Sequence, residues 1–101
     1  MARVKLEFRR SNETRAVRWT TAHGKEIKLL ITVGFHADGT PREVFCADFK
    51  AGSDLHPIVM DACILFSRLL QHDDAPAELA RSMCEPPSLL GTIARAVAEL
   101  D

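Results

Sequence analysis

The chain has few of the residues on which common catalytic and metal-binding motifs depend. Its three cysteines, Cys46, Cys63 and Cys84, lie far apart, and no CxxC pair occurs. An odd number of widely spaced cysteines fits reduced thiols in a cytosolic protein. Because zinc needs four convergent ligands, the absence of ligand-spaced cysteine or histidine pairs predicts no metal site. A lone thiol without an identifiable base predicts no nucleophile.

Long apolar runs and a strong net charge are also missing. No apolar segment approaches the roughly 20 residues of a membrane-spanning helix. The first ten residues, MARVKLEFRR, alternate charged and apolar side chains, unlike a signal peptide. The net charge is −1, so the molecule as a whole does not attract a polyanion. With 101 residues, of which 47% are hydrophobic, we expect one cytoplasmic domain without a membrane segment.

The charge is unevenly distributed along the chain. Residues 1–28 contain eight Lys and Arg against three Asp and Glu, a balance of +5. The remaining residues contain five against eleven, a balance of −6. This separation is consistent with internal pairing or with orientation of a partner.

The basic part contains a candidate surface for single-stranded nucleic acid. Its members are Arg9, Arg10, Arg15, Arg18 and Trp19. The alternative is an edge hairpin that its arginines keep in solution, with Trp19 in the core. RNA-binding sheets usually display several aromatic residues, so a single tryptophan supports the first interpretation weakly.

The first half of the sequence predicts β-strands. Apolar and polar residues alternate with period two over about residues 3–8, 15–21, 27–33 and 43–49. The turn at His36-Ala37-Asp38-Gly39 is a strong hairpin signal, because Asp-Gly supplies the positive φ that a tight turn needs. Short connections favour an antiparallel meander.

A long helix is predicted next. Ser53 is a suitable N-cap, and apolar positions between residues 55 and 69 recur with the helical period. Met60, Cys63 and Ile64 make the opposite side apolar as well. Such a helix should lie centrally on the sheet with a second cover, which is either the later helices or a second copy of the chain. The small size of the domain leads us to expect a homodimer.

Two shorter helices should follow, one over about residues 77–83 and one after the cap Ser88. The predicted fold is therefore α+β, with a four-stranded antiparallel meander followed by one long central helix and two shorter helices.

The turn before the long helix is the strongest candidate for a small ligand. Lys50, Gly52 and Ser53 precede the helix, whose free N–H groups and positive dipole end favour an anion. Arg42 and Glu43 are second candidates, because their strand belongs to the same block of motifs. The P-loop spacing is absent, and a glycine followed by a serine cap is also an ordinary strand-to-helix turn, so both interpretations stay open.

Several short motifs together resemble one known family, the TSCPD domain. They are Arg9-Arg10 with Asn12-Glu13-Thr14, Thr32-Val33-Gly34, Asp38-Gly39 with Pro41, Glu43-Val44-Phe45, Lys50-Ala51-Gly52-Ser53-Asp54-Leu55 and Leu70-Gln71-His72. The family includes the C-terminal region of adenosylcobalamin-dependent ribonucleotide reductases and small stand-alone bacterial proteins. The resemblance covers about residues 9–72.

The chain also departs from the family pattern. The Thr-Ser-Cys-Pro-Asp string and the paired C-terminal cysteines of the large reductases are absent, and Asp73 stands where we expect glycine after Leu-Gln-His. The radical-bearing barrel of those enzymes does not fit in 101 residues. The resemblance therefore implies a non-catalytic accessory module without a cofactor. It also implies a protein partner, either a reductase or a second copy, and, as a further expectation, a phosphate-bearing ligand.

Overall fold

The computed structural model describes residues 11–49 and 55–101, except for the side chains of residues 47–49. These parts form, in chain order, β1 (Asn12–Thr20), β2 (Glu26–Phe35), β3 (Pro41–Phe49), α2 (Leu55–Gln71), α3 (Pro76–Arg81) and α4 (Leu89–Glu99). The predicted α+β class is confirmed, with three antiparallel strands and three helices. The strand predicted over residues 3–8 and the N-cap Ser53 lie outside the described residues.

The strands form an antiparallel sheet in the order β1-β2-β3, as the meander prediction required. The turns between them place Gly24 and Gly39 at φ of +85° and +89°, a region that glycine adopts without steric cost. The pairing of β1 with β2 is unbroken. The pairing of β2 with β3 shifts between Leu30 and Ile31 and again beyond Gly34, so β3 does not follow the strict alternation that the sequence predicted.

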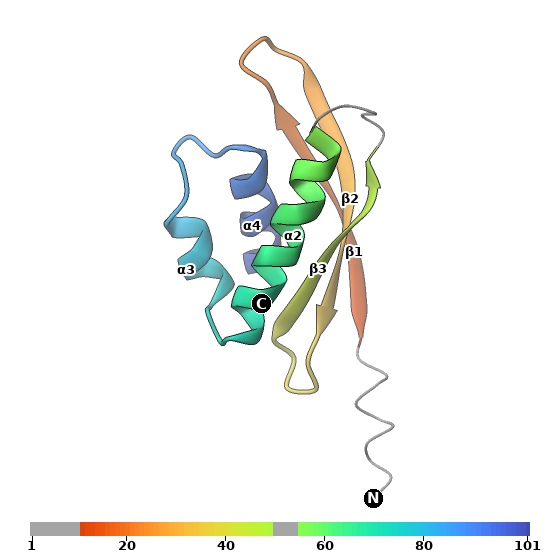
Figure 1. Cartoon of the computed structure of the whole chain (residues 1–101), viewed down its shortest axis with the longest axis vertical. Coiled ribbons are helices and arrows are strands. Elements are labelled where there is room, and N and C mark those ends of the chain that lie inside the picture. The colour runs from red at the N-terminus through yellow and green to blue at the C-terminus, as the bar shows by residue number, and fades with distance from the viewer. Residues whose placement is uncertain (1–10, 50–54) are drawn as a thin grey trace, which may run out of the picture.

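The two faces of the sheet differ in what covers them. On one face, β2 presents Leu29, Ile31, Val33 and Phe35, all of which are buried. Figure 1 shows all three helices on one side of the sheet. There α2 lies against β3, and α4 lies against β1. Within the described residues no helix covers the other face, which we call the open face.

The last helix is anchored as its sequence predicted. Ser88 caps α4, because its Oγ accepts a hydrogen bond from the Gly91 N–H at 3.1 Å. Leu89, Ile93 and Val97 then pack into the core. The preceding helix, α3, ends two residues earlier than expected.

α2 does not lie centrally on the sheet but against the edge strand β3, and of the two expected covers the later helices are not the one that covers it. It buries one row of side chains, namely Val59, Cys63, Phe66 and Leu70. The later helices do not cover its remaining apolar surface, because α4 lies over β1 and leaves the outside of α2 in water. The large apolar side chains of α2 that stay exposed are Ile58, Met60, Ile64, Leu65 and Leu69.

Candidate functional site

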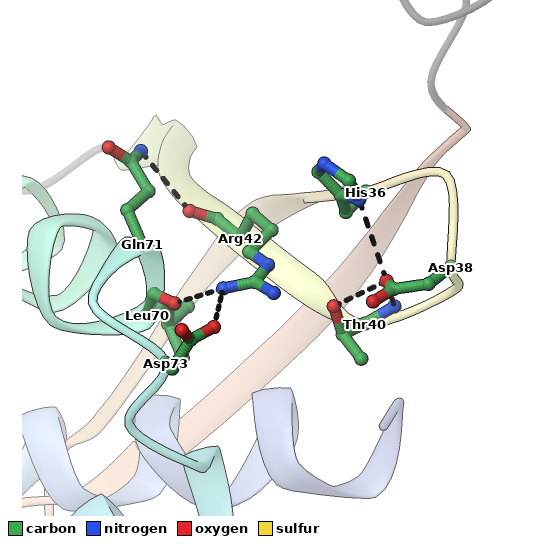
Figure 2. A network of polar contacts seen from close by, with 7 residues as sticks. All are labelled: His36, Asp38, Thr40, Arg42, Leu70, Gln71 and Asp73. Carbon is green, nitrogen blue, oxygen red and sulfur yellow. Dashed lines mark hydrogen bonds and ion pairs between the residues drawn. The ribbon is translucent and has the colours of Figure 1, made fainter.

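Arg42 links β3 to the C-terminal end of α2 (Figure 2). Its Nη1 donates hydrogen bonds to the backbone oxygen of Leu70 at 2.8 Å and to Oδ1 of Asp73 at 2.7 Å. The last four carbonyls of a helix have no partner within it, and a cation at this end also suits the helix dipole. The side chain of Arg42 is only 20% exposed. The geometry therefore gives Arg42 a structural role at the end of α2.

Asp73 occupies the position where the family resemblance led us to expect glycine. Its φ is +70°, in the left-handed region that glycine enters freely and that Asp and Asn enter more readily than most residues. Its carboxylate pairs with Arg42. Asp73 thus gives the end of the helix a left-handed residue and an ion pair.

The structure separates the second candidates for anion binding from the predicted turn. That turn precedes Leu55, whereas Arg42 contacts Leu70, and the helix between these two residues is about 22 Å long. The carboxylate of Asp73 also balances the charge of Arg42. Arg42 is therefore not at the expected anion site.

Glu43 lies beside Gly34 on the open face and also lines the rim of the space between β3 and α2. A Cβ added at Gly34 would be 3.2 Å from Oε1 of Glu43 and 3.4 Å from Oδ1 of Asn12, so both side chains extend over this glycine. Arg42 lies at the register shift of β3 and reaches the end of α2, whereas the next residue, Glu43, lies beside Gly34. Lys50, Gly52 and Ser53 lie outside the described residues.

Asp38 organises the tip of the β2–β3 hairpin (Figure 2). Its Oδ1 accepts hydrogen bonds from the Thr40 hydroxyl at 2.7 Å and from the Thr40 N–H at 3.0 Å. Nδ1 of His36 lies 3.7 Å from the same oxygen. The side-chain hydrogen bond from Thr40, followed by the backbone one, lowers the pKa of Asp38. These contacts are typical of an aspartate that stabilises its own turn.

The histidines are dispersed. His23 lies in the β1–β2 turn, His36 follows β2, His56 is in the first turn of α2, and His72 follows the end of α2. Within residues 11–49 and 55–101, no three His, Cys, Asp or Glu residues converge in a way that could hold a metal ion.

None of the helices in that same part of the chain has the length and hydropathy needed to cross a membrane.

Trp19 and Arg15 have contacts within the protein. The Trp19 indole N–H donates to the backbone oxygen of Pro87 at 3.0 Å, and the partly buried ring packs against the core. Arg15 lies 3.3 Å from a carboxylate oxygen of Glu13 and 3.4 Å from one of Glu99. The tryptophan thus holds the segment before α4, in agreement with the alternative that placed it in the core.

The remaining members of the candidate nucleic-acid surface lie elsewhere. Arg18 is exposed and alternates with Trp19 along β1, so it lies on the open face, opposite Lys28 of β2. Arg9 and Arg10 lie outside the described residues. The described members of the set therefore do not form one stacking surface.

The three thiols have different surroundings. Cys84 is exposed between α3 and α4, Cys63 is buried, and Cys46 is half-buried. Burial and, to a smaller extent, the neighbouring Cys46 raise the pKa of the Cys63 thiol to about 11. Cys63 is consequently protonated at neutral pH, and a protonated thiol is a poor nucleophile.

The exposed side of α2 is flanked by two apolar grooves. The α2–α4 groove has a volume of about 210 Å³, and all of its lining residues are apolar; they include Leu65, Leu69, Met83 and Ile93. The α2–β3 groove, on the other side of α2, has a volume of about 420 Å³. It is lined by Phe45 and other residues of β3 and by α2 residues that include Met60 and Ile64.

Polar residues of α2 cap the edge of β3 beside the second groove. The Val44 N–H donates to Oγ of Ser67 at 2.9 Å, and the Ser67 hydroxyl donates to the backbone oxygen of Cys63 at 2.8 Å. One turn further on, the side-chain amide of Gln71 donates to the backbone oxygen of Arg42 at 3.3 Å. Because outward-facing backbone groups of Arg42 and Val44 already bond to α2, this stretch of the edge is closed to another strand.

The candidate functional site is therefore the exposed apolar surface of α2, between the two grooves. The sequence predicted a helix that is apolar almost all round, but not which part of it would stay in water. No protein-family model matches the chain, and no curated protein and no solved structure matches it.

Proposed function

We propose that the chain is a stand-alone TSCPD-like module, related to accessory regions of ribonucleotide reductases, that is non-catalytic alone and binds a partner protein. The observation that carries the proposal is the exposed apolar surface of α2, where Ile64 is 57% and Leu65 63% exposed. Monomeric proteins rarely keep a contiguous patch of large apolar side chains in water unless it binds something.

The polar groups of the described residues support a binding role over a catalytic one. Arg42 holds the end of α2, and Asp38 holds its own turn. Cys63 is protonated at neutral pH because its pKa is raised to about 11. The proposal accordingly assigns no reaction to these residues.

The family resemblance makes an adenosylcobalamin-dependent reductase the first partner to test and a second copy of the chain the other. The proposal places the protein in the cytoplasm, where its three cysteines stay reduced. It also retains residues 3–8 as a fourth strand of the sheet. The proposed function does not include binding of nucleic acid. Arg15 and Trp19 have contacts within the protein, and Arg18 lies on the open face of the sheet.

Binding to a purified reductase, measured by biolayer interferometry, tests the choice of partner. Leu69→Ser, in the α2–α4 groove, should weaken the complex, since it removes apolar surface from the contact. Leu30→Ser on the open face is the matched control and should leave binding unchanged. If the reductase shows no binding at the highest usable concentration, it is not the partner.

A phosphate-bearing ligand at Lys50, Gly52 and Ser53 is the second part of the proposal. Titration with phosphate or nucleotides should shift the backbone amide NMR signals of these residues first, while the amide of Arg42, at the other end of α2, serves as the reference. Lys50→Ala should weaken binding with little loss of stability. Ser53→Ala should cost about 0.5–2 kcal/mol as a lost helix cap, with or without ligand. If millimolar ligand leaves these amides unmoved, the turn binds no phosphate.

A further inference from the structure

The outermost side of α2 carries a stripe of four residues, Asp61, Ile64, Leu65 and Arg68, which we call the outer stripe. Their spacing of three, one and three residues places them on one side of the helix. All four are exposed. Ile64 and Leu65 are the most exposed large apolar side chains of the described residues, and they lie midway between the acid and the base.

The two charges of the outer stripe have no partners within the described part of the chain. Asp61 and Arg68 are seven residues apart, about 10 Å along the helix axis, which is too far for them to pair with each other. Neither forms a salt bridge to another described residue. In contrast, the exposed Arg81 and Arg95 each pair with a nearby glutamate.

The order of acidic, apolar and basic residues in the outer stripe makes it complementary to a second copy that runs in the opposite direction. Along α2 it runs acid, apolar, apolar, base, and in the opposite direction it runs base, apolar, apolar, acid. A second α2 laid antiparallel would therefore place Asp61 beside Arg68 of the partner subunit at both ends of the contact. In the centre, Ile64 and Leu65 would meet the same two residues. A two-fold interface requires this kind of self-complementarity.

We propose that a second copy of the chain covers the outer stripe, with the two α2 helices antiparallel across a two-fold axis that passes between Ile64 and Leu65. The inference deepens the proposed function and rests on it, because it identifies the protein partner as the chain itself. A parallel arrangement is excluded by charge, since it would place Asp61 against Asp61 and Arg68 against Arg68.

The edge of the sheet supports a contact through helices. Ser67 and Gln71 already occupy outward-facing backbone groups of Val44 and Arg42, so this stretch of β3 cannot pair with a strand of a second copy. Met60 and Leu69 flank the outer stripe on its two sides, Met60 in the α2–β3 groove and Leu69 in the α2–α4 groove. Apolar side chains would thus extend the contact from the outer stripe toward the grooves on either side.

The first test is the mass of the whole protein in solution, measured by light scattering over a wide range of concentration. The expected result is twice the chain mass of 11.2 kDa at high concentration. Leu65→Glu should give a monomer with an unchanged circular dichroism spectrum, because this side chain lies outside the core. A wild-type protein that stays monomeric at all concentrations would overturn the inference, whether or not it binds a reductase.

A charge swap tests the antiparallel arrangement. Asp61→Arg and Arg68→Asp should each weaken the dimer about tenfold or more, because each creates two like-charge contacts per dimer. The double variant should restore the dissociation constant to within about threefold of the wild type, as coupled partners do in a double-mutant cycle. Lys28→Glu, on the open face, is the control and should have no effect.

Two outcomes of the swap would contradict the proposal. If the single variants dimerise as tightly as the wild type, the dimer uses another surface. If they weaken the dimer and the double variant does not recover, Asp61 and Arg68 do not face each other. Binding of a reductase is measured separately on the wild-type chain, at concentrations below those at which light scattering detects a dimer, so that failure of the dimer and failure of the wider proposed function are distinguishable.

Discussion

Helices α2 and α4 pack against the same face of one sheet, but they use their apolar side chains differently. α4 buries Leu89, Ile93 and Val97 and turns Arg95 and Glu99 to the solvent. α2 buries a similar row and still exposes five large apolar side chains on its other sides. Because the fold needs only the buried row, the additional apolar residues of α2 are available for an interface.

The two helices also differ in how they are held in place. The N-terminus of α4 is capped locally by Ser88, three residues before the N–H that it binds. The C-terminus of α2 is held by Arg42, from a strand that lies 28 residues earlier than Leu70. A local cap depends on neighbours in sequence, whereas the second arrangement depends on the assembled fold.

The largest expected effect concerns the inner row of α2. Leu70→Ala should lower the free energy of unfolding by about 2–5 kcal/mol, because Leu70 is fully buried and its truncation leaves a cavity. Leu65→Ala, on the exposed side, should change it by about 0.5 kcal/mol or less. Urea denaturation measures both, at a concentration where the protein is monomeric. Equal losses would mean that both sides of α2 are structural.

Removal of the arginine that holds α2 should have the next largest effect. Arg42→Met keeps most of the apolar stem but loses the hydrogen bonds to Leu70 and Asp73, and should cost about 1.5–3 kcal/mol. Asp73→Asn is the matched variant, because it removes only the charge that pairs with Arg42. Asparagine tolerates the positive φ at this position, and the aspartate side chain is 81% exposed. It should cost about 1 kcal/mol or less. A larger loss for Asp73→Asn would show that the ion pair, and not the helix carbonyl, is the main contact of Arg42.

The local cap of α4 should contribute less. Ser88→Ala should cost about 0.5–2 kcal/mol, because the Gly91 N–H loses its acceptor, while Ser88→Asp should retain most of the stability. Thermal unfolding compares the two variants with the wild type. If the alanine and aspartate variants are equally destabilised, the loss is one of packing around Ser88 and not of the cap.

The pH dependence that Cys63 contributes is confined to alkaline conditions. Burial raises its pKa in the folded protein from the ordinary 9.0 to about 11, so the folded chain keeps a proton that the unfolded chain releases. The stability that it contributes is therefore fully present below about pH 9 and lost as the pH rises toward 11. Denaturant unfolding across this range should show a steeper decline for the wild type than for Cys63→Ala. Parallel profiles would show that the thiol does not titrate with the folded state.

Several elements could be predicted because their signals are local. Asp38-Gly39 predicts the second hairpin and Ser88 predicts the start of α4, since each depends on contacts within a few residues. Alternation predicts β1 and β2. It fails in β3, where the register shifts against β2, because a shift is a property of the pair of strands and not of either one alone.

The candidate site could be predicted only in part. Its composition was visible in the sequence, including the apolar circumference of α2 and the placement of Asp61 and Arg68 seven residues apart. The role of Arg42 is not visible in the sequence, because its partners Leu70 and Asp73 follow it by 28 and 31 residues. The sequence motifs group Arg42 with the turn at the other end of the helix.

Local sequence signals are thus sufficient for the order and type of the described elements, for their turns and for the excess of apolar residues on α2. These follow from backbone preferences and side-chain periodicity, which act over a few residues. Packing of the elements against one another sets three other features: α4 lies over β1 and not over α2, Arg42 holds the end of α2, and Ile64 and Leu65 stay in water. Those outcomes depend on which surfaces meet when the elements pack, and this competition between surfaces is not encoded in any single segment.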